Sequence, residues 1–244
     1  MAHLEKLLAN VPYDAFKLIA TDGVFSMEGD IAKLDEISNL AKKYNATVFV
    51  DDAHSLGVFG PAGQGTAAHY NITHKVDLIM GTFSKSLASI GGFIAADRNV
   101  IEYLKHHARS LIFSASISPA ATASALAALN VLKDEPERLE KLWDNTNYTL
   151  EAFKEAGFDV GPTESPIIPI YVRDNEKTFL MAKMLMDEGV FVNPIVSPAV
   201  SSDSSMIRFS LMATHSFKQI DFAVEKLKKV AFKLKIPLLN TAKV

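Results

Sequence analysis

Polar side chains that could take part in catalysis or ligand binding lie at or just after the ends of three apolar runs in the first part of the sequence. In chain order they are Ser26; Asp51 and His54; and Thr82, Ser84 and Lys85. The runs before them, residues 16–23, 46–53 and 76–83, each have the composition of a β-strand. Ligands of open α/β sheets bind at the carboxyl ends of the strands. If the three strands share one sheet, we expect these side chains to meet in one crevice.

Lys85 is the one charged residue in GTFSKSLASIGG, residues 81–92. This setting predicts a half-buried amine, which is unfavourable unless a partner neutralises it or a reaction uses it. Desolvation favours the neutral amine, which can form a Schiff base. An aspartate can hold a proton on a ring nitrogen, and hydroxyl groups can bind phosphate. These are the requirements of pyridoxal 5'-phosphate.

Less specific interpretations of the same residues remain open. The D-D-A-H run, with His69 and His74 downstream, could supply ligands to a divalent metal in a hydrolase, although no second ligand pair is clear and we expect no metal site. A lysine in a Ser/Gly loop is often simply solvated. Hydroxyl residues at strand ends often form turns or helix caps.

Arg208 interrupts the apolar run MIRFSLMA, residues 206–213. An arginine in such a strand needs an anionic partner or a position at the edge of the sheet. Its planar guanidinium group suits a carboxylate.

The elements that must position these residues alternate in the manner of an α/β fold with a mainly parallel sheet. Further strands are predicted at residues 91–97 and 110–116. The helix predicted between the first two strands has an apolar face formed by Ile31, Leu34, Ile37, Leu40 and Ala41. We predict two domains: a large α/β domain over residues 1–130, and a smaller α+β domain with a linking helix over residues 131–244.

Composition excludes several classes of protein. The net charge is −3 and long Lys/Arg runs are absent, which argues against a nucleic-acid partner. The chain has no cysteine, and no apolar run approaches the roughly 20 residues that span a bilayer. The segment MAHLEKLLAN lacks the apolar centre of a secretion signal. We therefore expect a cytoplasmic globular protein.

Four segments together resemble the α-oxoamine synthases, pyridoxal phosphate enzymes of the fold type I aminotransferase superfamily. The segments are TDGVFSMEGD, VDDAHSLGVFG, GTFSKSLASIGG and IRFSLMATH, and they occur in the family's order. The resemblance covers nearly the whole chain and implies the C-terminal part of a fold type I transferase. Within the family, the sequence looks closest to the bacterial branch that condenses L-serine with palmitoyl-CoA, the first step of sphingolipid synthesis.

The resemblance implies a role for each candidate residue. Lys85 would form the Schiff base with the coenzyme and transfer the α-proton. Asp51 would pair with the pyridine nitrogen, and His54 and Ser26 would contact the phenolic oxygen. Thr82 and Ser84 would bind the phosphate, with Ser114 of a second subunit completing that site in a homodimer. Arg208 would bind the substrate carboxylate, and Asp52 would point to the other side of its strand.

The activity implied is decarboxylative condensation of an amino acid with an acyl-CoA. Glycine or alanine could replace serine, since other members of the family use them. The family's glycine-rich segment and ring-stacking histidine are expected before residue 1, and their loss would uncover sheet edges and apolar faces. The alternatives are therefore a fragment of a larger enzyme, a shortened non-catalytic dimerising paralogue, or a piece that works with a partner.

Overall fold

The computed structural model describes residues 1–239, which form two compact units. The first unit consists of Met1–Val24 with Ile31–Pro136, and the second of Phe25–Asp30 with the chain from Glu137 onward. The predicted domain boundary at residues 130 and 131 stays a prediction. The end of the predicted small domain, residues 240–244, lies outside the described residues.

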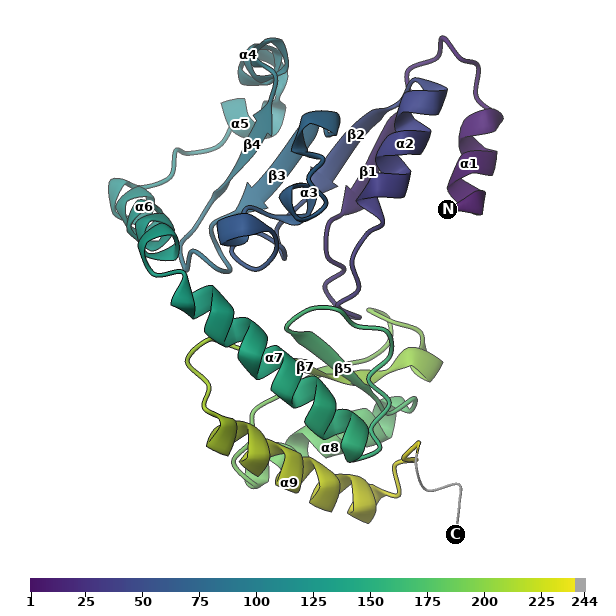
Figure 1. The fold of residues 1–244 in the computed structure, drawn as a ribbon, viewed down its shortest axis with the longest axis vertical. Helices are drawn as coiled ribbons and strands as arrows, with labels where there is room; N and C mark the ends of the chain where they lie inside the picture. Colours follow the sequence, from purple (N-terminus) through teal and green to yellow (C-terminus); the bar gives the residue numbers. More distant parts are fainter. Residues whose placement is uncertain (240–244) are drawn as a thin grey trace. The chain divides into compact units, whose positions relative to one another are not determined.

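A four-stranded sheet forms the centre of the first unit (Figure 1). Its strands lie in the order β1 (Leu18–Asp22), β2 (Thr47–Asp51), β3 (Leu78–Thr82) and β4 (Gly92–Ala96). The first three strands are parallel, and β4 is antiparallel to β3. The prediction of a mainly parallel α/β sheet is therefore confirmed, and the three strands that precede the candidate residues are direct neighbours.

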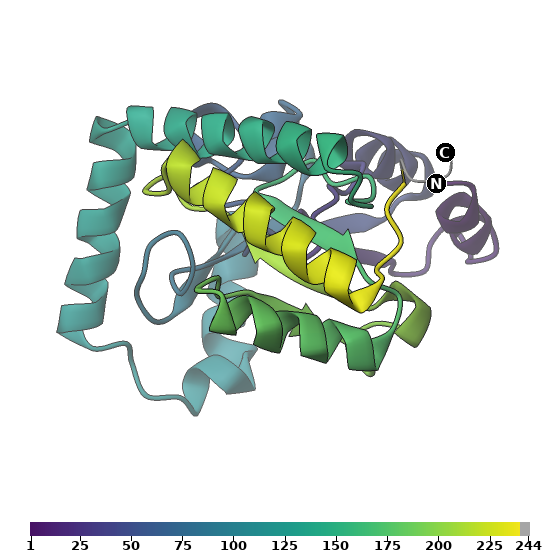
Figure 2. The ribbon, with the colours of Figure 1, turned by 90° about the horizontal axis from the view of Figure 1, so that it is seen from below.

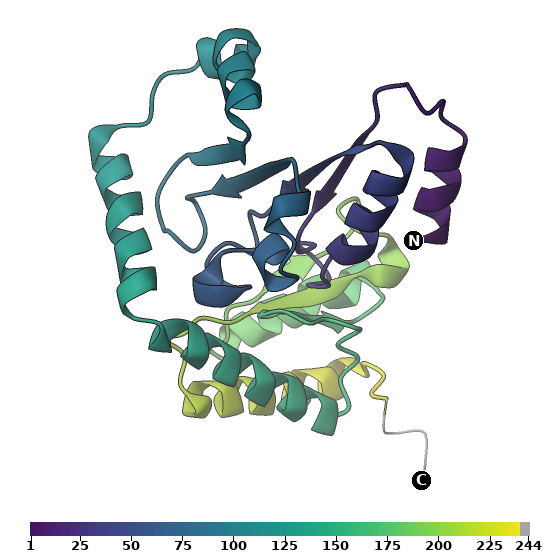
Figure 3. The ribbon, with the colours of Figure 1, turned by 45° about the horizontal axis from the view of Figure 1, so that its top comes forward.

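One face of this sheet packs against helix α2 (Leu34–Tyr44), as Figure 3 also shows. Side chains alternate between the two faces of a strand, so Ile19, Val48 and Val50 point to the helix and are buried there. The helix begins at Leu34, and Ile31, which was predicted on its apolar face, instead forms an antiparallel bridge with Val24. Residues Asp22, Asp51 and Thr82 belong to the opposite face.

The remaining helices of the first unit are short apart from α4 and α6. They are α1 (Ala2–Ala9), α3 (Thr66–His69), α4 (Arg98–His107), α5 (Arg109–Ile112), α6 (Pro119–Asp134) and the 3₁₀ helices η1 (Pro61–Gly63) and η2 (Thr73–Lys75).

The strand predicted at residues 110–116 is wrong. Residues Arg109–Ile112 form the helical turn α5, and the backbone N–H of Phe113 donates to the carbonyl of Arg109. A strand needs a neighbour to accept its backbone hydrogen bonds, whereas this segment satisfies them locally and leaves the Phe113 side chain 79% exposed. An apolar run alone did not distinguish the two outcomes.

The second unit is a three-stranded antiparallel sheet with helices on one face (Figure 2). The strands lie in the order β5 (Ile167–Tyr171), β7 (Met206–Ser210) and β6 (Asn193–Ile195). The helices are α7 (Glu137–Glu155), α8 (Asn175–Asp187) and α9 (Phe217–Leu234), and Ser202–Ser204 forms the 3₁₀ helix η3. Phe153, Ile168, Leu185 and Leu227 lie in one buried core that joins sheet and helices.

Candidate active site

Asp51 and Thr82 lie on the same face of the sheet, at the carboxyl ends of neighbouring parallel strands. Asp51 is the register partner of Met80, and Thr82 is two residues further along β3. Because side chains repeat every two residues along a strand, Met80 and Thr82 share the face that carries Asp51. The Asp51 carboxylate accepts a hydrogen bond from the backbone N–H of Ala53, at 2.9 Å. This contact fixes the carboxylate at the start of the turn that leads to half-buried His54.

Asp52 points to the opposite side of the strand and is buried. Its carboxylate accepts hydrogen bonds from the Ser55 hydroxyl and, at 3.1 Å, from the backbone N–H of Thr66. Burial raises the pKa of Asp52, and these hydrogen bonds partly oppose that shift. The backbone at Gly23 approaches so closely that a Cβ there would lie 2.1 Å from the Asp52 carboxylate. Asp52 thus anchors the turn that carries Asp51 and His54.

Two hydroxyl groups lie side by side where β3 ends. The Oγ atoms of Thr82 and Ser84 are 2.8 Å apart, and the Thr82 hydroxyl donates to the Gly91 carbonyl at 3.2 Å. The backbone N–H of Ser84 donates to Thr82 Oγ1 at 3.3 Å. These contacts fold the loop back onto the strand end. A pair of adjacent hydroxyls in such a loop can donate to one anionic group.

Lys85 follows this pair but is exposed, so the predicted half-buried setting is wrong. The loop turns tightly here, since the N–H of Ala88 donates to the Lys85 carbonyl at 3.0 Å. Leu87 is the side chain that the loop buries. The small and uncharged neighbours of Lys85 therefore reflect a tight turn with one apolar anchor, and the lysine stays accessible.

Ser114 lies just after helix α5 and is exposed. Its hydroxyl donates to the backbone carbonyl of Ser110, one helical turn earlier. The segment that carries it is the one predicted as a strand, so Ser114 is presented by a loop.

The second unit brings together the other two predicted residues, Ser26 and Arg208. The Arg208 Nε donates to the backbone carbonyl of Ser26 at 2.7 Å, and its Nη1 donates to the Ser210 hydroxyl at 2.6 Å. Arg208 lies on β7, the central strand of its sheet, so an edge position is excluded. Within residues 1–239 no carboxylate pairs with it. Burial lowers the pKa of Arg208, because the half-buried charge is partly desolvated.

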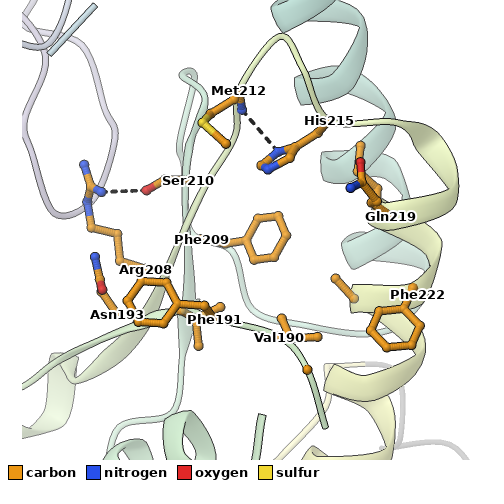
Figure 4. A pocket seen from close by; sticks show the side chains of 14 residues that line it. Val190, Phe191, Asn193, Arg208, Phe209, Ser210, Met212, His215, Gln219 and Phe222 are labelled. Carbon is orange, nitrogen blue, oxygen red and sulfur yellow. Dashed lines mark hydrogen bonds between the residues drawn. The ribbon is translucent and has the colours of Figure 1, made fainter. Parts of the chain in front are cut away.

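An apolar cavity of about 490 Å³ also lies in the second unit (Figure 4). Val190, Phe191, Phe209 and Phe222 are among the side chains that line it. Figure 4 shows the guanidinium group of Arg208 at its margin, directed at Ser210. No sequence pattern predicted this cavity, because its lining comes from separate strands and helix α9.

Sequence reasoning also missed Asp22, the last residue of β1. Asp22 ends β1 as Asp51 ends β2. Its position at a strand end could therefore have identified it as a candidate site residue.

Within the described chain, residues 1–239, no group of three or more His, Cys, Asp or Glu side chains is placed to hold a metal ion. Over the same residues, every helix is too short or too polar to span a bilayer.

Comparison with known proteins identifies the class. A family model described as aminotransferase class I and II matches residues 1–227. The chain therefore belongs to the aminotransferase class I and II family.

Individual relatives show which members of this family the chain is similar to. The chain is 63% identical over 233 residues to serine palmitoyltransferase of Bacteroides ovatus. The aligned residues are 96% of this chain and 59% of the relative. It is 48% identical over 214 residues to 8-amino-7-oxononanoate synthase of Petrotoga mobilis, covering 88% of this chain and 54% of the relative. These relatives confirm the resemblance to the α-oxoamine synthases. The chain spans 59% of the length of the first of them.

Solved structures agree with this assignment. The fold resembles a serine palmitoyltransferase from S. paucimobilis with a TM-score of 0.92 at 33% identity, covering 96% of this chain and 59% of that chain. A solved structure of SPT with PLP gives the same TM-score, identity and coverage. The expected fold, the C-terminal part of a fold type I transferase, is confirmed.

Proposed function

We propose that this protein is a pyridoxal phosphate-dependent C-acyltransferase that joins an amino acid to an acyl-CoA with loss of carbon dioxide. L-Serine and palmitoyl-CoA are the preferred pair, which would make this the first step of sphingolipid synthesis. One observation carries the proposal: Asp51 and Thr82 lie on one sheet face at neighbouring strand ends, with Lys85 three residues beyond Thr82. The coenzyme, when bound, supplies an electron sink for charge that develops on the substrate α-carbon.

The donors of the first unit fit this coenzyme. The Asp51 carboxylate would hold a proton on the ring nitrogen, since a negative charge stabilises the protonated ring. The adjacent hydroxyls of Thr82 and Ser84 would bind the phosphate. Lys85, exposed and on a tight turn, would attach the coenzyme and, once released by the substrate, move the proton at the α-carbon. His54 would hydrogen bond to the phenolic oxygen.

The second unit would supply the substrate carboxylate site. Arg208 is half-buried and lacks a carboxylate partner within residues 1–239, so an incoming carboxylate would neutralise a charge that burial disfavours. A bidentate pair with the guanidinium would also orient the α-carbon. Ser26, whose carbonyl accepts from Arg208 Nε, would turn its hydroxyl to the phenolic oxygen of the coenzyme.

The proposal extends to assembly and location. The protein would act as a homodimer, in which Ser114 of one subunit binds the phosphate in the other. Its loop position and exposure support a contact with a second copy. We further propose a cytoplasmic location, which the absence of cysteine supports.

The test replaces Lys85 by Ala in the purified protein, with Lys75→Ala as the control. Lys75 is an exposed lysine at the end of η2 in the same unit. Wild type and Lys75→Ala should show the visible absorbance of a lysine–coenzyme Schiff base, and Lys85→Ala should lose it. Wild type without that absorbance, or Lys85→Ala with it, would refute the proposal. Release of free CoA with serine, glycine or alanine, against short and long acyl-CoAs, then identifies the substrates.

A further inference from the structure

Asp22 stands beside Asp51 on the sheet face that carries the candidate residues. The two aspartates are direct register partners in the parallel pair β1 and β2. Register partners in neighbouring strands present their side chains to the same face. Both carboxyl groups are half-buried and lie at the carboxyl end of the sheet. Two like charges are thus placed side by side where the coenzyme would bind.

The Asp22 carboxylate is not held by the hydrogen bonds that fix its neighbours. Within residues 1–239 it accepts no hydrogen bond and forms no ion pair. Asp51 and Asp52, by contrast, both accept hydrogen bonds from the turn that follows β2, Asp51 from the backbone N–H of Ala53 and Asp52 from the Ser55 hydroxyl. A half-buried carboxylate that accepts no hydrogen bond and forms no salt bridge is unfavourable for folding, and such groups in a site are candidates for a functional role.

Two charged groups act electrostatically on Asp22. They are Asp51 on β2 and Lys85 in the loop after β3. Burial raises the pKa of Asp22, the Asp51 carboxylate raises it further, and the Lys85 ammonium opposes the shift. Asp22 is therefore electrostatically coupled both to the proposed partner of the ring nitrogen and to the proposed coenzyme-binding lysine.

We propose that Asp22 is a positioning residue that acts through Asp51 and Lys85. Its carboxylate adds a second negative charge to the site, which favours a proton on the Lys85 amine and on the ring nitrogen that Asp51 would contact. The ring-nitrogen part rests on the proposed function, whereas the Lys85 part concerns the chain alone. Asp22 itself transfers no proton and needs no contact with the substrate.

The first test uses the coenzyme-free protein and measures how fast acetic anhydride acetylates Lys85 at a series of pH values, by mass spectrometry. Only the neutral amine reacts, so the rate profile reports the protonation of this one lysine. Asp22→Asn should move the midpoint about half a pH unit lower, the size expected for one partly solvated charge pair. Asp22→Glu keeps the charge and should restore the midpoint towards that of wild type.

Asp35→Asn is the matched control, because Asp35 is an exposed aspartate in the first turn of α2 and carries the same charge. Its midpoint should equal that of wild type. The inference is overturned if Asp22→Asn and Asp35→Asn have the same midpoint, or if Asp22→Glu shifts it as far as Asp22→Asn does.

The second test adds pyridoxal phosphate and follows the pH dependence of the visible absorbance. The midpoint of this titration should also fall in Asp22→Asn and stay unchanged in Asp35→Asn. An unchanged midpoint in Asp22→Asn overturns the part of the inference that concerns the protein with bound coenzyme. If wild type forms no Schiff base while the acetylation midpoint still shifts, the proposed function fails and the coupling of Asp22 to Lys85 stands.

Discussion

At the scale of single residues, Asp52 makes a prediction about stability and pH. Its pKa is raised above the ordinary 3.8 in the folded chain, chiefly by burial. The folded state therefore binds this proton more tightly than the unfolded state does. The resulting stabilisation is fully present below pH 3.8 and is lost as the pH rises through the folded value. In Asp52→Asn, which cannot titrate, we expect the free energy of unfolding to lose this falling component.

Urea unfolding of wild type and Asp52→Asn at a series of acidic to neutral pH values measures the effect. The stability advantage of wild type over the variant should shrink as the pH rises. Asp35→Asn, with an exposed side chain, provides the comparison for general charge effects. A difference between wild type and Asp52→Asn that is constant with pH would contradict the prediction.

Strand periodicity predicted the orientation of some candidate side chains correctly and failed to predict the surroundings of others. It separated Asp51 from buried Asp52, because a period of two is a property of the backbone. It did not predict the exposure of Lys85, which depends on how residues 83–91 fold back, nor the central position of Arg208 in its sheet. The first depends on the three-dimensional path of one loop and the second on the pairing of strands that are distant in the chain, and the alternation of residue types reports neither.

At the scale of elements, a buried side chain on α7 holds the connection between β7 and α9. The Asn145 amide donates to the backbone carbonyls of Met212 and His215, at 3.0 and 2.9 Å. Asn145→Ala leaves both carbonyls without this donor and opens a small void, so we expect a loss of about 2 to 3 kcal/mol in the free energy of unfolding. Chemical denaturation measures it. Asn147→Ala, at an exposed position on the same helix, should change it by less than about 0.5 kcal/mol.

The connection between β7 and α9 also forms part of the wall of the cavity, because Met212 and His215 line the cavity. The backbone N–H of Met212 donates to His215 Nδ1 at 3.2 Å, which closes the turn that Asn145 anchors. If Asn145→Ala were as stable as Asn147→Ala, the two hydrogen bonds would contribute little and the turn would be held by its flanking elements alone.

Element prediction succeeded where periodicity and neighbours agreed. The first four strands were found in their places because each has a partner in the sheet. The run at residues 110–116 is also apolar, yet helix α5 satisfies its backbone hydrogen bonds locally. An apolar composition shows that a segment could form a strand. Whether a neighbouring strand is present to pair with it depends on the whole fold.

At the scale of the whole chain, the order of motifs carried more information than any one motif. The four segments that suggested the α-oxoamine synthases span both compact units, and the family match extends over residues 1–227. The side chains at the strand ends, taken singly, were also compatible with metal binding or with simple solvation. The functional class therefore came from a pattern distributed along the chain, whereas the register and hydrogen bonds of the candidate site came from the structure.

The sheet face that carries Asp22 and Asp51 also exposes apolar side chains, which leads to a prediction about association. Leu18 is 52% exposed and Ile94 is 38% exposed on this face. Exposed apolar surface of this kind promotes association between molecules. In the double variant Leu18→Thr/Ile94→Thr, static light scattering should detect fewer species larger than a dimer than in wild type. Phe232→Ser removes an 85% exposed side chain from α9 in the second unit and should leave scattering unchanged. Equal scattering from wild type and the double variant would show that this sheet face does not drive the association.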